Sequence, residues 1–268
     1  MPPTRVILAG ATGWAGSELA RGIGTAPDLR LVAAVARSAA GRRLTEVLGE
    51  PAPDAPVFAT AREALAQPAE VFVEYTKPDT AKANLLAALA AGCHGVVGTS
   101  GLTEADYAEI DAAARAAQRG VLACGNFAIT VVLLQKFALM AARYLDHFEV
   151  IDYAHADKID APSGTARELA HRLGQVRTPV NAVPLDQMRG PREARGATLN
   201  GVQVHSLRLP GHVIGVEAQF GAPDERLVLR HDAGASARPY VGGALLAIRR
   251  VHRLIGVHRG LDAVMDEA

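Results

Sequence analysis

The sequence has no excess of either charge, since its 268 residues include 28 Lys and Arg against 28 Asp and Glu. Proteins that bind nucleic acid by releasing counterions usually carry a basic excess or basic blocks, so this balance argues against a nucleic-acid partner. Zero net charge combined with 49% hydrophobic residues also excludes a disordered chain. The length has room for one large domain or two modest ones, each with its own core.

Cysteine and long apolar runs are scarce as well. Cys93 and Cys124 stand in apolar stretches without metal-ligand spacing around them, which predicts two reduced, buried thiols and no metal site. No apolar run reaches the roughly 18 residues that a membrane span needs. The N-terminus also lacks a signal-peptide pattern, so the sequence predicts a cytoplasmic protein with no membrane contact.

The first half of the sequence alternates short apolar runs with helical patterns. We expect strands at residues 5–8, 29–36, 71–75, 94–98 and 120–124, with helices up to about 23 and over 79–91 and 104–118. Strands that alternate with helices predict parallel βαβ units. The right-handed crossover rule then favours an α/β fold with a doubly wound parallel sheet, the Rossmann fold.

The pattern changes after Asn126. We expect a helix at 129–144, a strand at 149–153, a helix from about 163, a long loop at 177–200, and strands at 202–209, 213–220 and 226–231. Consecutive strands without intervening helices predict a mixed or antiparallel sheet, and therefore a second, α+β domain over 126–234. A final helix at 240–254 is expected to return to the first domain, which would contain 1–125 and 235–268.

A glycine-rich turn follows the first expected strand. Gly10, Gly13 and Gly16 form a GxxGxxG pattern at the start of a helix. Glycines permit a tight turn and close approach to a pyrophosphate, and the helix N-terminus adds free N–H groups and a partial positive charge. The pattern and its position indicate dinucleotide binding, the alternative being a plain strand–helix turn.

The end of the second strand bears on the choice of dinucleotide. An acidic residue there would bind the ribose 2′-hydroxyl of NAD. The sequence instead has Arg37 at this point, and arginine suits a 2′-phosphate. We therefore expect NADPH as the cofactor, with NADH as the alternative.

Lysine occurs only four times, and Lys158 opens the most informative stretch, KIDAPSGTA at 158–166. Pro162 is tolerated at a helix start, and Asp160 or Ser163 could cap that helix. The N–H groups of Ser163, Gly164 and Thr165 would then point at an anion, with hydroxyls as further donors and Lys158 as a nearby charge. The stretch predicts a carboxylate site, the alternative being an ordinary capped helix.

This stretch resembles the most specific motif of the dihydrodipicolinate reductase family, also called 4-hydroxy-tetrahydrodipicolinate reductase. Further segments match the family in order along nearly the whole chain: the glycine-rich turn, EYTKP at 74–78, GTSGL at 98–102, NFAI at 126–129, and HDA, Arg238 and GGA at 231–244. The resemblance implies an NAD(P)H-dependent reductase of a cyclic unsaturated imine dicarboxylate. The family reaction converts 4-hydroxy-tetrahydrodipicolinate to tetrahydrodipicolinate in lysine and diaminopimelate biosynthesis.

The resemblance also implies particular site residues and a homotetramer built on the central sheet domain. It places the substrate carboxylate on Gly164 and Thr165, with Ser163, Lys158 and His155 beside it. It places the cofactor on residues that follow the strands of the first domain: Gly10, Ala11, Thr12, Gly13, Trp14, Ala15, Arg37, Thr76, Gly98, Thr99, Ser100, Cys124, Gly125, Asn126 and Phe127.

One departure from the family concerns the proton. The family usually has two adjacent histidines four and three positions before the lysine, the first being its proposed proton donor. This sequence has Ala154 and His155 there, and Asp157 replaces another usual histidine. Two hypotheses follow: a working family member in which His155 or Lys158 delivers the proton, or a divergent paralogue that reduces a different carboxylated imine. A non-catalytic dinucleotide-binding regulatory protein is the third alternative.

Overall fold

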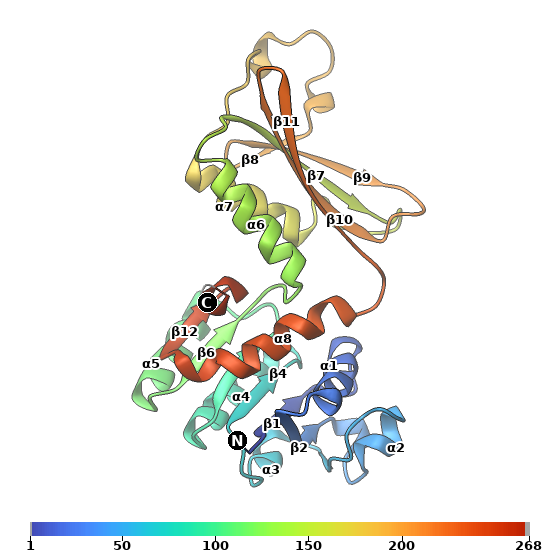
Figure 1. Ribbon diagram of the computed structural model, residues 1–268, viewed down its shortest axis with the longest axis vertical. Helices are drawn as coiled ribbons and strands as arrows, with labels where there is room; N and C mark the ends of the chain where they lie inside the picture. The colour runs from blue at the N-terminus through green and yellow to red at the C-terminus, as the bar shows by residue number, and fades with distance from the viewer. Residues whose placement is uncertain (1, 266–268) are drawn as a thin grey trace. The chain divides into compact units, whose positions relative to one another are not determined.

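The computed structural model describes residues 2–265 and divides into two compact units. The first unit contains Met1–Ile129 and Ala237–Ala268, and the second contains Thr130–Ser236 (Figure 1). Each unit has its own sheet and its own helices. The described part of the chain contains no helix that is long and apolar enough to span a bilayer.

The first unit contains a seven-stranded sheet in which every pairing is parallel. This arrangement confirms the predicted doubly wound fold. In spatial order the strands are β12 (Gly256–Arg259), β6 (Gly120–Ala123), β5 (His94–Val97), β4 (Val71–Glu74), β1 (Thr4–Ala9), β2 (Leu29–Val35) and β3 (Val57–Phe58). The strands read as continuous apolar runs because a parallel sheet with helices on both faces buries both sides of each strand.

Four longer helices accompany this sheet: α1 (Trp14–Thr25), α4 (Pro78–Ala90), α5 (Glu104–Ala116) and α8 (Arg238–Arg250). Helix α8 packs on α1, as Figure 1 shows, and a Cβ atom on Gly22 of α1 would lie 2.4 Å from Cγ1 of Val241. Glycine at this position therefore lets the two helices approach closely. The C-terminal helix does return to the first unit, as the sequence predicted.

Several short elements of this unit were not predicted, because segments this short have no readable hydrophobic period. They are the strands β3 and β12, the helices α2 (Leu44–Leu48) and α3 (Ala61–Ala64), and single 3₁₀ turns at Arg37–Ala39 and Leu261–Val264. The end of the helix expected at 240–254 is a 3₁₀ turn at Val251–Arg253. Strand β12 matters most for the fold, because it adds the C-terminal segment to the sheet beside β6.

The second unit contains a five-stranded mixed sheet. In spatial order its strands are β11 (Glu225–Ala233), β10 (Ile214–Ala222), β7 (His147–Ala154), β9 (Val202–Arg208) and β8 (Ala197–Leu199). Strands β7 and β9 are parallel and the other neighbours are antiparallel. The predicted long loop is therefore wrong at its end, where 197–199 form β8. It also contains 3₁₀ turns at Leu185–Gln187 and Arg192–Arg195.

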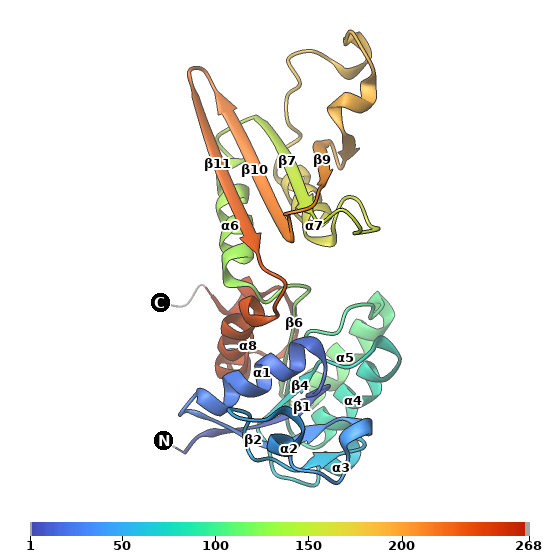
Figure 2. The same cartoon turned by 90° about the vertical axis from the view of Figure 1, so that its right-hand side faces the viewer.

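Helices α6 (Ile129–Ala141) and α7 (Gly164–Val176) cover the same face of this sheet (Figure 2). Their apolar side chains form one core with residues of β7, β9 and β10, among them Leu134, Ala138, Phe148, Val150, Leu169, Leu173, Val204 and Ala218. Successive residues of a strand point to opposite faces. Asp152 and Ala154 follow Val150 at intervals of two, so both lie on the covered face, and both are fully buried.

Candidate active site

A pocket of about 350 Å³ in the first unit is formed by loops that follow β1, β4, β5 and β6 and by Tyr240 of α8. Ligands of doubly wound sheets bind outside the carboxyl ends of the strands, which is where these loops lie. Most of the predicted cofactor residues line the pocket: Gly13, Trp14, Ala15, Thr76, Gly98, Thr99, Ser100, Cys124, Gly125, Asn126 and Phe127. Gly10, Ala11, Thr12 and Arg37 do not line it.

The glycine-rich turn is built so that only glycine fits at two positions. A Cβ atom on Gly10, whose φ is +80°, would lie 2.3 Å from the carbonyl oxygen of Tyr75. A Cβ atom on Gly16 would lie 2.0 Å from the carbonyl oxygen of Gly10. Gly13 caps α1 without any side-chain hydrogen bond, so the first turn of the helix offers its N–H groups to a ligand. A pyrophosphate fits this cradle.

Glu74 ties together two of the loops that line the pocket. It ends β4 with no exposure to solvent. Its carboxylate accepts hydrogen bonds from the Thr76 N–H at 2.7 Å and from Asn84 Nδ2 at 2.8 Å. The hydroxyl of Thr99 lies 3.2 Å from the Glu74 carbonyl oxygen and donates to it. The predicted site did not include Glu74. A signal for its role was present in the sequence, because a carboxylate at the end of an apolar strand is buried and needs hydrogen-bond donors.

Tyr75 forms part of the pocket wall behind Gly98. A Cβ atom on Gly98 would lie 2.3 Å from Cε1 of Tyr75, so this glycine also lets the ring pack closely against the loop. The Tyr75 ring lies 5.9 Å from that of Phe127, centroid to centroid. Burial raises the pKa of the Tyr75 hydroxyl, and this group has no hydrogen-bond partner among the described residues.

An aromatic pair that no local pattern could predict closes one side of the pocket. Trp14 at the start of α1 meets Tyr240 of α8 edge-on, with ring centroids 5.7 Å apart. The indole is 61% exposed. Tyr240 stands more than two hundred positions later in the sequence, so only the folded chain brings it to the dinucleotide turn.

Arg37 lies just beyond β2 and differs from its basic neighbours. Arg43 pairs with Asp54 at 2.7 Å, and Arg42 lies 3.8 Å from Glu46. Arg37 forms no ion pair within residues 2–265, so its guanidinium keeps its bonding capacity for a ligand.

The second unit contains the predicted carboxylate site at the start of α7. Ser163 caps the helix, and its hydroxyl accepts a hydrogen bond from the Ala166 N–H at 3.3 Å. The Ser163 N–H donates to Oδ2 of Asp152 at 2.9 Å. The expectation that Ser163 would offer its N–H to a ligand is therefore wrong, because a buried carboxylate already takes it. In the described structure the N–H groups of Gly164 and Thr165 have no acceptor.

The remaining predicted side chains stand in the loop between β7 and α7. Lys158 Nζ lies 2.6 Å from Oδ1 of Asp160, and this hydrogen bond lowers the pKa of the Asp160 carboxyl. His155 Nδ1 contacts the carboxylate of Asp157, which lowers the pKa of that carboxyl. Ala154 points into the core and carries no exchangeable proton. His155 and Lys158 are the basic side chains of this loop, and each lies beside a carboxylate.

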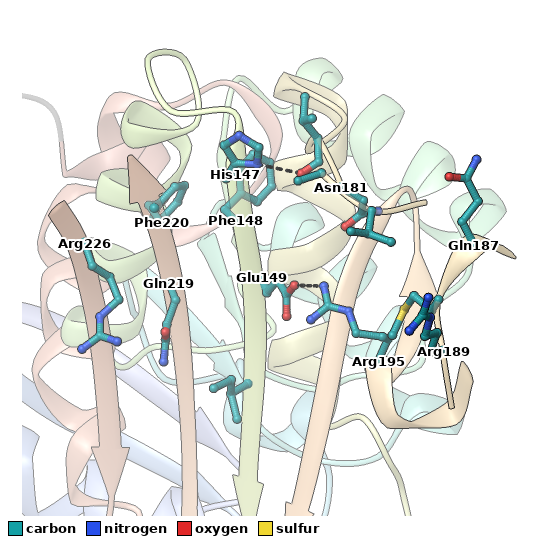
Figure 3. Close-up of a pocket in the computed structure, with 16 residues that line it drawn as sticks. His147, Phe148, Glu149, Asn181, Gln187, Arg189, Arg195, Gln219, Phe220 and Arg226 are labelled. Atoms are coloured by element: carbon teal, nitrogen blue, oxygen red, sulfur yellow. Dashed lines mark hydrogen bonds and ion pairs between the residues drawn. The ribbon is translucent and has the colours of Figure 1, made fainter. Parts of the chain in front are cut away.

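A larger pocket of about 750 Å³ lies elsewhere on the second unit, and none of the predicted site residues lines it. Figure 3 shows its polar side chains on neighbouring strands and on the loop that precedes β8. Glu149 contacts Arg195 and accepts a hydrogen bond from His205 Nε2 at 2.7 Å. Arg189 and Arg226 also line the pocket and form no ion pair within residues 2–265, so this surface keeps an excess of positive charge.

These features define a class of protein. A doubly wound unit with a pyrophosphate cradle, together with a second unit that carries an anion-binding helix start, is typical of oxidoreductases that use NAD(P)H on small acids. The protein is an oxidoreductase of this class.

Comparisons with known proteins give the family. Residues 4–127 match the family model described as "Dihydrodipicolinate reductase, N-terminus", and residues 130–265 match "Dihydrodipicolinate reductase, C-terminus". The chain is 37% identical to 4-hydroxy-tetrahydrodipicolinate reductase of Thermosynechococcus vestitus, over 98% of this chain and 97% of that one. It is 34% identical to the reductase of the same name from Bacillus mycoides, over 99% and 100% of the two chains. The chain belongs to the dihydrodipicolinate reductase family.

A solved structure agrees with this placement. Dipicolinate-bound dihydrodipicolinate reductase from Paenisporosarcina sp. TG-14 superimposes with a TM-score of 0.88 at 28% identity, covering 98% of this chain and all of that one. Amine dehydrogenase from Mycobacterium smegmatis shares the fold at 17% identity and a TM-score of 0.65.

Proposed function

We propose that the protein reduces 4-hydroxy-tetrahydrodipicolinate to tetrahydrodipicolinate with NADPH, in lysine and diaminopimelate biosynthesis. The observation that carries this proposal is the start of α7, where two N–H groups have no acceptor in the described structure and which follows Lys158 closely in the chain. A carboxylate on the substrate would be held there by charge-assisted hydrogen bonds. The relatives that match nearly the whole chain are named 4-hydroxy-tetrahydrodipicolinate reductase, and this name suggests the particular substrate.

The residues of the first unit fit the cofactor that this reaction needs. When bound, NADPH supplies the hydride. The cradle of Gly10, Gly13 and Gly16 would hold its pyrophosphate, and the loops tied by Glu74 would hold the rest of the molecule. Arg37 would take the 2′-phosphate, since its neighbours Arg42 and Arg43 are already paired.

The proton would come from the loop between β7 and α7. Reduction of a conjugated imine needs one proton, and a positioned His or Lys usually delivers it. His155 fits this role because Asp157 holds its Nδ1 and so fixes the orientation of the ring. Lys158 is the other candidate, although its ammonium is also the positive charge that a substrate carboxylate would meet.

A second candidate function follows from Ala154. A chain with no proton donor at this position suits an imine that is already protonated and needs no acid from the protein. The carboxylate site would then serve a different carboxylated imine. A third candidate is a regulatory protein that binds the dinucleotide through its first unit and catalyses nothing. Such a protein would not need the carboxylate site.

One assay separates these functions. NADPH oxidation with freshly generated 4-hydroxy-tetrahydrodipicolinate should proceed at a rate typical of metabolic enzymes, on the order of 10 per second. Tight NADPH binding without turnover on this substrate, but with turnover on another cyclic imine acid, would favour the divergent paralogue. NADPH binding without turnover on any imine would favour the regulatory protein.

We also propose a homotetramer assembled through the second unit. On the opposite face of its sheet, the described part of the unit places no helix like α6 or α7, and only the loop before β8 lies against part of it (Figure 2). Leu207 and Val228 lie on this face and are 36% and 41% exposed. The large pocket of Figure 3 lies there too, between the sheet and the loop before β8. Sedimentation velocity should give a species of four chains, and a monomer would contradict the proposal.

A further inference from the structure

Asp152 and Arg208 form a buried ion pair on the covered face of the second unit's sheet. Arg208 Nη2 lies 2.7 Å from Oδ2 of Asp152, and the two side chains are 15% and 0% exposed. They stand on the adjacent parallel strands β9 and β7, where Asp152 is opposite Ser206 and Ala154 is opposite Arg208. The pair is thus fixed by the register of two strands in the middle of the sheet.

Each member of the pair also holds one end of the segment that leads into α7. Asp152 Oδ2 accepts the Ser163 N–H at 2.9 Å. Arg208 Nη2 donates to the carbonyl oxygen of Asp160 at 2.7 Å. The stretch from Asp160 to Ser163 is therefore tied at both ends to one ion pair. Lys158 stands just before this stretch and Gly164 just after it.

The stability of the fold alone does not account for this ion pair. Taking two charges out of water costs free energy that their attraction barely recovers, and apolar residues of similar volume often do as well. Within the described residues, Asp152 Oδ1 and Arg208 Nε are buried and have no hydrogen-bond partner, which adds to the cost. What the pair does provide is a fixed position for the loop.

Neither residue is placed to bind the substrate itself. Asp152 is fully buried, and a carboxylate would repel a carboxylate ligand. Arg208 Nη2 is already shared between Asp152 and the Asp160 carbonyl. Any effect of the pair on the reaction must pass through Ser163 and Asp160 to the groups beside them.

We propose that Asp152 and Arg208 are positioning residues for the carboxylate site. They hold the loop so that the free N–H groups of Gly164 and Thr165 and the ammonium of Lys158 converge on one carboxylate. This inference rests on the proposed function of the same site. It places the control of dicarboxylate affinity in a buried pair that contacts no ligand.

The test compares Arg208→Lys, Arg208→Met and Asp152→Asn with the wild type in the full-length protein. Lysine keeps the charge, but its ammonium ends one bond short of the Nη2 position from which Arg208 reaches both Asp152 and the Asp160 carbonyl. We expect KM for the substrate and the calorimetric Kd for dipicolinate to rise at least tenfold, because small displacements of binding groups are costly. The Kd for NADPH should change less than twofold, and a two-unit unfolding profile like that of the wild type in urea denaturation shows that the second unit of each variant is folded.

Two further variants sharpen the test. Ser206→Ala removes a hydrogen bond to Asp152 but leaves both ties to the loop, so its KM and dipicolinate affinity should stay within twofold of the wild type. The double variant Asp152→Asn with Arg208→Met should lose little more dipicolinate affinity than either single variant, because the two residues act as one unit.

The outcomes separate the positioning role from the reaction. If single variants that bind NADPH normally keep the wild-type KM and dipicolinate affinity, the positioning role is overturned. If the wild type binds dipicolinate in a way that depends on Asp152 and Arg208 but does not turn over the substrate, the proposed reaction fails and the positioning role stands. If the wild type binds no dicarboxylate at all, both fail.

Discussion

Lys158 and Asp160 face each other in the loop that precedes α7, with Nζ 2.6 Å from Oδ1. The lysine is thus held by a carboxylate of its own chain at the place where a substrate carboxylate is expected. Both groups are accessible, since the lysine side chain is 24% and the aspartate 44% exposed. A dicarboxylate ligand that binds Lys158 would therefore compete with the carboxylate of Asp160.

Removal of the lysine should weaken dicarboxylate binding. Lys158→Met keeps most of the side-chain length but loses the charge, and a hydrogen bond to a charged group contributes about 1.5–3 kcal/mol. We expect the dipicolinate Kd to rise by about ten- to a hundredfold, as measured by calorimetry in the presence of NADPH. Lys136→Met on α6 is the matched control. An unchanged Kd in Lys158→Met would show that the ammonium does not contact the ligand.

Neutralisation of Asp160 should have the opposite effect. Asp160→Asn keeps the carbonyl oxygen that Arg208 binds and removes the negative charge beside Lys158. Exposed ion pairs contribute little free energy, so the dipicolinate Kd should fall by no more than about fivefold. Weaker binding in this variant would mean that Asp160 orients the lysine more than it competes with the ligand.

Arg37 should determine the preference between the two dinucleotides. Arg37→Ala removes a guanidinium that would contact the 2′-phosphate, a group that NADH lacks. The Kd for NADPH should rise about tenfold or more while the Kd for NADH stays within twofold. Arg42→Ala is a matched control, because Arg42 already lies beside Glu46. Equal losses for both dinucleotides would contradict the role of Arg37.

The part of the dinucleotide pocket that is formed by short local segments was predictable from the sequence. The turn at Gly10–Gly16 and the loops after β4, β5 and β6 follow apolar strands, so their meeting at one edge of a parallel sheet is expected. Tyr240 joins the same pocket from the C-terminal helix, and no local pattern could place it there.

The role of Ser163 was missed for a different reason. Its N–H partner, Asp152, stands eleven residues earlier on β7. A signal was present, because Asp152 falls in phase with Phe148 and Val150 in an alternating strand and so had to be buried. A buried carboxylate needs donors, and the nearby helix start supplies one. The short strand β12 had no comparable signal, since four residues carry no readable period.

Replacement of Gly16 should lower the stability of the protein, because no side chain fits at this position. A Cβ atom at this position would lie 2.0 Å from the carbonyl oxygen of Gly10, so α1 would have to move away from the turn that follows β1. We expect Gly16→Ala to destabilise the protein by about 1–3 kcal/mol in urea denaturation. Gly234→Ala is the control, since no atom lies within 4 Å of its Cβ position. Equal stability of the two variants would contradict the packing argument.

His94 should make the stability of the protein fall in mild acid. Burial, together with the nearby Arg119 and His252, lowers the pKa of this imidazole to about 4 from an ordinary value of 6.5. Its neutral Nδ1 accepts the N–H of Gly120 at 3.0 Å, which joins the first residues of β5 and β6. The unfolded chain thus binds a proton at a higher pH than the folded chain does.

The sign of the effect follows from this difference. The contribution of His94 is complete above about pH 6.5 and is lost progressively as the pH falls toward 4, because only the unfolded state is protonated in that window. Since the ring is only about half buried, we expect a loss on the order of 1 kcal/mol. Urea denaturation at several pH values should show this fall in the wild type and a smaller one in His94→Asn, whose amide oxygen can still accept the Gly120 N–H. Identical pH profiles for the two proteins would assign the acid sensitivity to other groups.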